Sequence, residues 1–142
     1  MTVARIINEK GRDVVTAAAD TTLAMLAATL SEKRIGAIVI VGDDAIRGIV
    51  SERDIVRAVA KHGGEALAMR ASDWMTARVV TCHPEDTIDD VMEKMTSGRF
   101  RHLPVVKGGK LAGIISIGDV VKHRIEQVLR EAAEIRDNIA TA

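Results

Sequence analysis

The chain has 142 residues, of which 47% are hydrophobic and 28% charged, and its formal net charge at pH 7 is zero. A chain of this length buries a hydrophobic core of its own, and its balanced charge gives it no general attraction for the phosphate backbone of a nucleic acid. With 1 Phe, 1 Trp and no Tyr, it also lacks the aromatic side chains on which single-stranded nucleic acids stack.

The single cysteine, Cys82, excludes an internal disulfide, which fits a reducing compartment. The first residues lack the apolar stretch of a signal peptide, and no apolar run reaches the roughly 18 residues that a transmembrane helix needs. We therefore expect a cytoplasmic protein that binds neither a membrane nor a nucleic acid.

An internal repeat organises the chain, because residues 14–56 align without a gap with residues 79–121. Both copies start with Val-Val-Thr and carry a Gly-Ile pair near their end. Two copies are too few for a solenoid. We therefore expect two homologous halves related by a pseudo-twofold axis, with two related ligand clefts between them.

Each copy predicts the element order β-α-β-β-α. The strands are expected at 14–16, 37–41 and 46–50 in the first copy and at 79–81, 103–106 and 111–115 in the second. Thr22 and Thr87 suit helix N-caps, and Gly- or Asp-rich turns at 42–44 and 107–110 suit hairpins. The fold class is α/β (α+β), with both repeats followed by a C-terminal helix.

We expect one domain over residues 3–65 and a second over residues 71–130, each with a short lead-in segment. A helical tail over 120–139 continues from the second domain. Its apolar residues recur on one face, at Ile125, Val128, Ala132, Ile135 and Ile139. Left uncovered, such a face marks an interface, so we expect a homodimer; the alternative is that the tail folds back over its own core.

The strongest local signal is a Gly-apolar-apolar-Ser-x-x-Asp segment, which occurs at 48–54 and again at 113–119. The glycine lets another group approach the backbone, the Ser and the helix N–H groups suit a phosphate, and the Asp can accept both ribose hydroxyls. The same spacing fits a capping box, in which Ser51 and Ser116 cap a helix and Asp54 and Asp119 bond back. The segment alone leaves both interpretations open.

The two copies, with their GIVSERD and GIISIGD segments, resemble a tandem pair of CBS domains, also called a Bateman module. RIGAIVIV and RFRHLPVV are similar to the second-strand region of that family, and DWMT is similar to its lead-in, so the resemblance covers roughly residues 3–125. It implies a stand-alone, bacterial-type, non-catalytic regulatory or sensor module. The implied ligand contains adenosine, such as AMP, ADP, ATP, NAD or S-adenosylmethionine.

The resemblance also implies roles for individual residues. Asp54 and Asp119 would bind the ribose, and Ser51 and Ser116 would bind phosphate. In that family the base pocket is built from the first strand and the middle of the second. Here these are Thr16, Ala17, Ile38, Thr81, Cys82 and Leu103.

The copies differ where Gly36-Ala37 aligns with Arg101-His102. Members of the resembled family that bind phosphates often carry basic residues at this place. Arg101 can hold a phosphate with two hydrogen bonds, and His102 can add positive charge near neutral pH. Arg53 at a helix start suggests an anionic neighbour. The alternative is that Arg101, His102 and Arg53 are ordinary solvated basic residues. If they bind phosphate, the two sites are unequal, because the other copy lacks these residues at the aligned positions.

The four His residues show no zinc-ligand spacing, and no nucleophile–base–orienter set is visible. We therefore expect no enzyme activity, no catalytic residue, no catalytic cofactor and no metal. The sequence also shows no output domain, so a regulator of this kind would act on an unknown protein target. The alternative function is a structural dimerisation or interaction module without a physiological ligand.

Overall fold

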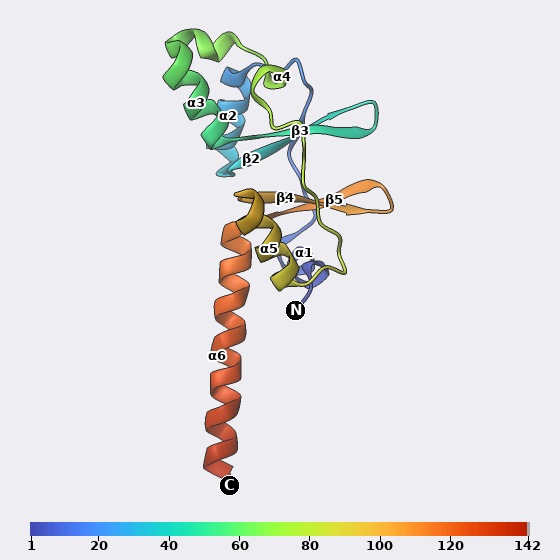
Figure 1. Ribbon diagram of the computed structural model, residues 1–142, viewed down its shortest axis with the longest axis vertical. Coiled ribbons are helices and arrows are strands. Elements are labelled where there is room, and N and C mark those ends of the chain that lie inside the picture. The colour runs from blue at the N-terminus through green and yellow to red at the C-terminus, as the bar shows by residue number, and fades with distance from the viewer. Residues whose placement is uncertain (142) are drawn as a thin grey trace.

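The computed structural model describes residues 1–141 as two hairpins stacked one over the other, with helices on the outer side of each (Figure 1). The first repeat forms β1 (Thr16–Ala17), α2 (Leu23–Lys33), β2 (Ala37–Gly42), β3 (Ala45–Ser51) and α3 (Glu52–His62). The second forms α5 (Ile88–Gly98), β4 (His102–Lys107), β5 (Lys110–Ser116) and α6 (Ile117–Thr141). The remaining elements are α1 (Val3–Lys10), the 3-10 helix η1 (Gly63–Ala68) and α4 (Ala71–Trp74). The predicted mixed α/β fold is confirmed.

The second repeat lacks the strand that the sequence predicts at 79–81. In the first repeat, the Val39 N–H donates to the Val15 carbonyl over 3.2 Å, and β1 pairs in parallel with β2. The residue equivalent to Val39 is Pro104, which has no N–H to donate. Only an isolated parallel bridge, between Cys82 and Val105, forms in its place.

The two lead-in segments cross over between the repeats. Helix α1 joins the core of the second repeat, where the Val3 N–H donates to the Asp86 carbonyl over 2.8 Å. Helix α4 joins the core of the first repeat, where the Ala71 N–H donates to the Thr21 carbonyl over 2.8 Å. In Figure 1 the chain runs from α1 beside the lower hairpin up to the first repeat, and from α4 back down to α5. Residue 3 thus precedes the first repeat along the chain but packs on the second.

Helices α2 and α5 begin and end alike. Each begins with a threonine N-cap whose hydroxyl accepts a backbone hydrogen bond. The Met25 N–H donates to Thr22 at 3.3 Å, and the Asp90 N–H donates to Thr87 at 3.1 Å. Both helices end at an arginine in the left-handed conformation, Arg34 with φ 53° and Arg99 with φ 57°. Most non-glycine residues avoid this conformation because the Cβ atom crowds the following carbonyl.

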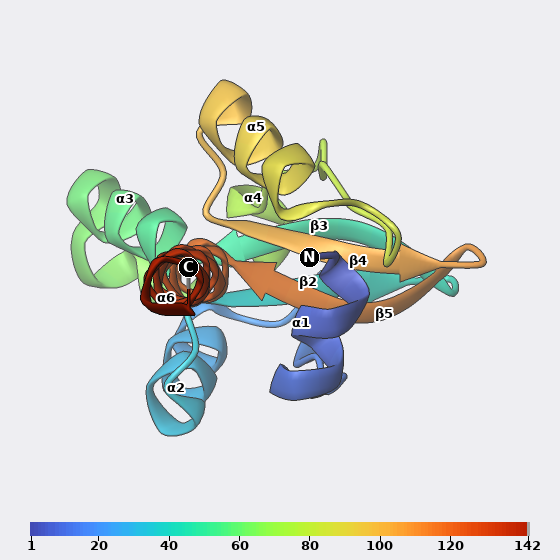
Figure 2. The same cartoon turned by 90° about the horizontal axis from the view of Figure 1, so that it is seen from below.

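Helix α6 is the second helix of the second repeat and the predicted tail in one unbroken element. It leaves the body at its N-terminal end and runs away from both hairpins, as Figure 1 shows from the side and Figure 2 end-on. Beyond its first turns its large apolar side chains are mostly exposed, including Ile125 at 54% and Ile135 at 60%. The tail therefore does not fold back over its own core.

Candidate ligand-binding site

The Ser-x-x-Asp segment of the first repeat joins β3 to α3 and forms a complete capping box. The Asp54 Oδ2 atom accepts the Ser51 N–H at 2.8 Å and the Ser51 hydroxyl at 3.1 Å. The Asp54 N–H in turn donates to Ser51 Oγ at 3.4 Å. Asp54 is buried, and its Oδ1 atom lies 3.9 Å from an Arg57 guanidinium nitrogen. This carboxylate therefore already caps the helix.

The matching segment of the second repeat makes the same cap and gains a cation. The Ser116 N–H donates to Asp119 Oδ2 at 2.9 Å, and the Asp119 N–H donates to Ser116 Oγ at 3.1 Å. From α1, the Lys10 ammonium donates to Asp119 Oδ2 at 2.6 Å and to the Ile114 carbonyl at 3.0 Å. Burial by itself raises the pKa of Asp119, but the bonds from Lys10 and Ser116 outweigh it and leave that pKa below its usual value.

Lys10 contacts the second Ser-x-x-Asp segment, and the sequence interpretation did not single it out. It lies 109 positions from Asp119 and outside both repeats, so no motif spacing links the two residues. Only the crossover of α1 onto the second repeat brings them together. The ammonium makes the second Ser-x-x-Asp segment different from the first, in addition to the differences that the sequence predicts.

A second contact across the repeats joins the starts of β2 and β4. A Cβ atom added at Gly36 would lie 2.9 Å from the His102 Nε2 atom and 3.0 Å from the Glu52 Oε1 atom. Burial lowers the pKa of His102, and the positive charge of Lys10 lowers it further, while Glu52 and Asp119 act in the opposite direction. Gly36, Glu52, His102, Lys10 and Asp119 therefore form one polar cluster between the two repeats.

The predicted phosphate and base residues differ widely in accessibility. Arg53, Arg101 and Thr16 are exposed, while Ala17 and Thr81 are half-buried. In contrast, Ile38, Cys82 and Leu103 are almost entirely buried within the two hydrophobic cores. Burial also raises the pKa of the Cys82 thiol to about 11. These last three side chains pack against protein and do not line an open surface.

Other parts of the chain pack directly against the two motif glycines, Gly48 and Gly113. A Cβ atom at Gly48 would lie 2.6 Å from the Met75 sulfur and 2.9 Å from the Thr76 carbonyl oxygen. At Gly113 it would lie 2.8 Å from the Ile7 Cδ1 atom. The crossed lead-in segments therefore account for the glycine in both repeats.

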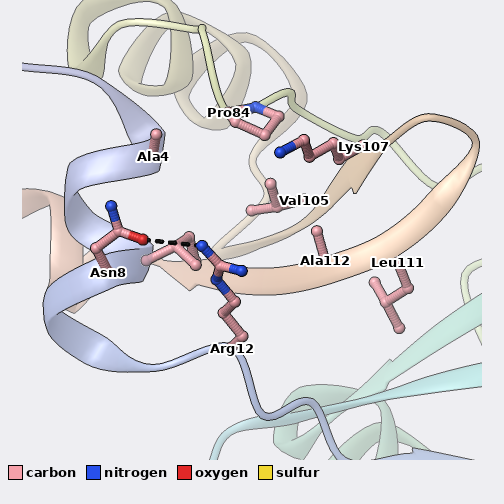
Figure 3. Close-up of a pocket in the computed structure, with 9 residues that line it drawn as sticks. Ala4, Asn8, Arg12, Pro84, Val105, Lys107, Leu111 and Ala112 are labelled. Atoms are coloured by element: carbon pink, nitrogen blue, oxygen red, sulfur yellow. Dashed lines mark hydrogen bonds between the residues drawn. The ribbon is translucent and has the colours of Figure 1, made fainter.

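Two cavities lie beside the predicted residues. One, of about 450 Å³, lies between α1 and the β4–β5 hairpin, where Figure 3 shows Arg12 and Lys107 around an apolar floor. The Arg12 guanidinium there donates to Asn8 Oδ1 at 3.2 Å. The other, of about 520 Å³, lies between α2 and α3 and includes Gly36 and Glu52. None of the predicted site residues lines either cavity, although the second borders the polar cluster.

A buried histidine outside this cluster connects α1 with α6. His123 is 3% exposed, and its Nε2 atom lies 3.6 Å from a Glu9 carboxylate oxygen. Its Nδ1 atom lies 3.6 Å from a Glu126 carboxylate oxygen. One ligand atom from each of Glu9, His123 and Glu126 lies within 4.8 Å of those of the other two, so the buried imidazole stands between a carboxylate of α1 and one of its own helix.

Comparison with known proteins assigns the chain to a family. The model of the CBS domain matches residues 3–61 and again residues 71–126. The chain is similar to a CBS-domain protein of Agrobacterium tumefaciens, with 49% identity, a TM-score of 0.85, and coverage of 87% of this chain and 99% of the other. It is also similar to a putative signal-transduction protein with CBS domains of Burkholderia ambifaria, with 41% identity, a TM-score of 0.84, and coverage of 89% and 95%.

A mitochondrial CBS domain-containing protein of Arabidopsis thaliana shares 30% identity over 135 residues, which are 89% of this chain. The chain spans 66% of the length of that protein and 58% of the length of a Methanopyrus kandleri relative. Over residues 1–141, no helix combines the length and apolar character that a membrane crossing needs. The two matches and the two interlocked repeats establish that the chain belongs to the CBS-domain family and carries two CBS domains.

Proposed function

We propose that this protein is a non-catalytic regulatory or sensor module that binds an adenine nucleotide of the AMP, ADP, ATP or NAD class. The observation that carries the proposal is the Ser-x-x-Asp segment, which is present in both repeats at the same join between a strand and a helix. Helix N-termini attract phosphate, and an Asp in the first turn can accept ribose hydroxyls. The polar cluster between the repeats contains one residue of each segment, Glu52 and Asp119.

A structural relative supports the ligand class. A CBS domain pair with 23% identity and a TM-score of 0.80 was solved in complex with 5′-methylthioadenosine and S-adenosyl-L-methionine. At this identity the likeness concerns the fold, so the adenosine ligand of this chain is our inference. The two ligands of that relative share the adenosine group, which is the part that Asp54 and Asp119 would bind here.

In the proposed sites, Asp54 and Asp119 bind ribose, and Ser51 and Ser116 bind phosphate. Asp119 must share its carboxylate between Lys10, which bonds Oδ2, and the ribose hydroxyls, or exchange the ammonium for them. Arg53 and Arg101 supply positive charge for phosphate, and His102, whose pKa burial lowers, supplies it when a bound phosphate favours the charged ring. The base contacts are proposed for Thr16, Ala17, Ile38, Thr81, Cys82 and Leu103, of which Thr16, Ala17 and Thr81 are accessible without opening the core.

The test is titration calorimetry with AMP, ADP, ATP and NAD on Asp54→Ala, Asp119→Ala and the double variant. Each single change should remove or weaken one site by at least about tenfold, and the double change should abolish binding. Asp90→Ala is a matched control, because Asp90 also completes a capping box but lies on α5, outside the proposed sites. Binding by the double variant equal to that of the wild type would refute the ribose assignment.

The same titrations test the inequality of the sites. Arg101→Ala should lower the affinity for phosphorylated ligands far more than the affinity for adenosine, since Arg101 is assigned to phosphate alone. An equal loss for both ligands would remove Arg101 from the phosphate site.

We further propose that the protein acts in the cytoplasm as a homodimer on an unknown protein target. A relative with 28% identity and a TM-score of 0.78, a CBS-CP12 protein of bloom-forming cyanobacteria, is hexameric, which supports an oligomeric state. The alternative is a dimerisation or interaction module without a physiological ligand. It is supported by the capping boxes, which already use the Ser and Asp side chains. A nucleotide that raises the unfolding temperature would argue against this alternative.

A further inference from the structure

The exposed face of α6 carries a regular apolar stripe. Its members are Val121, Ile125, Val128, Ala132, Ile135 and Ile139. Successive members are alternately four and three residues apart, which is the heptad spacing of a coiled-coil seam. The large members are exposed in the single chain, from 49% at Val121 to 71% at Ile139. A stripe of this regularity on a helix that has left the body indicates a second helix as its partner.

The contacts of α6 with the body leave this stripe free. His123, which is buried against Glu9, occupies the heptad position opposite the seam. Arg124 lies at position g, next to the seam, and its guanidinium nitrogen is 3.5 Å from a carboxylate oxygen of Asp89 in α5. The body therefore holds one side of α6 and leaves the seam open to another molecule.

We propose that α6 pairs with the α6 of a second copy of this chain as a parallel two-stranded coiled coil. Ile125, Ala132 and Ile139 occupy the a positions, and Val121, Val128 and Ile135 occupy the d positions. The proposal rests on the homodimer in the proposed function and names its surface and orientation. It does not depend on a nucleotide.

The charges beside the seam favour the parallel orientation. In a parallel pair, a residue at position g faces the residue five positions later, at position e, on the partner helix. Glu131 at g then faces Arg136 of the second copy at e, so two attractive pairs form across the twofold axis.

The antiparallel pair with full overlap has the opposite charge pattern. Alignment of Val128 with Ala132 of the second copy pairs position g with g and e with e. Glu131 then faces Glu131, and Lys122 faces Arg136, so each of these contacts joins like charges. The parallel pair also places both CBS modules at the same end of the coil, so the same surfaces of the two copies can meet.

The first test measures the dimer dissociation constant of the full chain by analytical ultracentrifugation. Val128→Lys/Ile135→Lys places charge in the seam and should raise this constant at least about tenfold, because each side chain loses its buried contacts. Ala133→Lys/Glu134→Lys adds lysines on the same helix outside the seam and should leave it unchanged. All four substituted positions lie beyond the contacts of α6 with the body. Circular dichroism should therefore show that the CBS modules of both variants unfold as in the wild type.

Each outcome of this measurement is informative. An unchanged constant in the seam variant would overturn the pairing of α6 and leave the homodimer to another surface. A monomeric wild type would overturn both the pairing and the proposed homodimer. A trimeric wild type would overturn the two-stranded arrangement.

The second test determines orientation. Arg136→Glu should weaken a parallel dimer, because Glu131 then faces a second carboxylate in place of the guanidinium, and the exchange Glu131→Arg/Arg136→Glu should restore it. The same single change would tighten an antiparallel dimer by relieving the contact with Lys122. In addition, Ile135→Cys should cross-link readily only in the parallel pair, since the two sulfurs would otherwise lie about 15 Å apart along the axis. The native Cys82 is buried and does not compete.

Discussion

Lys10 of α1 places its ammonium 2.6 Å from the carboxylate of Asp119 in α6, although 109 positions separate the two residues. The ammonium bonds one oxygen of the carboxylate that the proposed ribose contact would use. In the first repeat the cation beside the matching carboxylate is Arg57 of the same helix, whose guanidinium lies 3.9 Å from the other oxygen, Oδ1 of Asp54. Lys10 therefore competes with a ribose for Asp119 if the proposed second-repeat site binds adenosine.

Lys10→Met should raise the affinity of the second-repeat site for adenosine several-fold, because Asp119 no longer exchanges an ammonium for the ribose hydroxyls. Titration calorimetry of adenosine measures the change, and the same substitution in an Asp119→Ala background should have no effect. The folded state should lose less than about 1 kcal/mol, since both side chains are partly exposed and water screens the pair. Weaker adenosine binding by Lys10→Met would show that the ammonium assists the ligand.

The depressed pKa of His102 predicts a loss of stability in mild acid. Burial comes first among its causes and the charge of Lys10 second, and together they hold this pKa below the ordinary 6.5. The unfolded chain then binds the proton more readily than the folded chain, so stability is full above about pH 6.5 and falls as the pH drops below it.

Urea denaturation at a series of pH values between about 7.5 and 5.5 measures this effect. His102→Gln should flatten the acid side of the profile, whereas His62→Gln, at an exposed position, serves as the control. Identical profiles for the wild type and His102→Gln would contradict the assignment. An anionic phosphate bound beside His102 should reduce the acid loss, because it favours the charged ring.

The equivalent glycines of the two repeats should differ in their tolerance of a methyl group. Gly48→Ala should cost about 3 kcal/mol, because the new Cβ atom meets a backbone carbonyl that cannot turn aside. Gly113→Ala should cost only about 1 kcal/mol, since it meets the end of the Ile7 side chain, which can rotate. Denaturant unfolding of both variants provides the comparison, and equal costs would contradict this account.

Glycine should stabilise the ends of α2 and α5. Arg34→Gly and Arg99→Gly should each raise the free energy of unfolding by up to ~1 kcal/mol, because glycine adopts the left-handed conformation without a steric penalty. Lys33→Gly, one residue earlier and still helical, should instead lower it by about 0.5–1 kcal/mol. If Arg34→Gly destabilised the protein as much as Lys33→Gly, the left-handed conformation assigned to Arg34 would be contradicted.

Local sequence patterns determined most elements of the two repeats, whereas helices α1 and α4 form where the sequence indicated only short lead-in segments. The repeat, the N-caps Thr22 and Thr87 and the hairpin turns follow from spacing and turn chemistry, which involve only neighbouring residues. The one strand that the sequence predicts and the structure lacks also has a local cause. Pro104 cannot donate the hydrogen bond that Val39 donates in the first repeat, but the need for that bond appears only when the strands are paired.

The tertiary structure alone decided which residues meet. An apolar strand buried on both faces does not reveal which of its side chains face the helices, so the burial of Ile38 and Leu103 in the cores could not be predicted from their pattern. The contacts of Lys10 with Asp119 and of His102 with Gly36 depend on the crossover of α1 and on the stacking of the two hairpins. These arrangements join segments far apart in the chain, and no spacing within one segment carries that information.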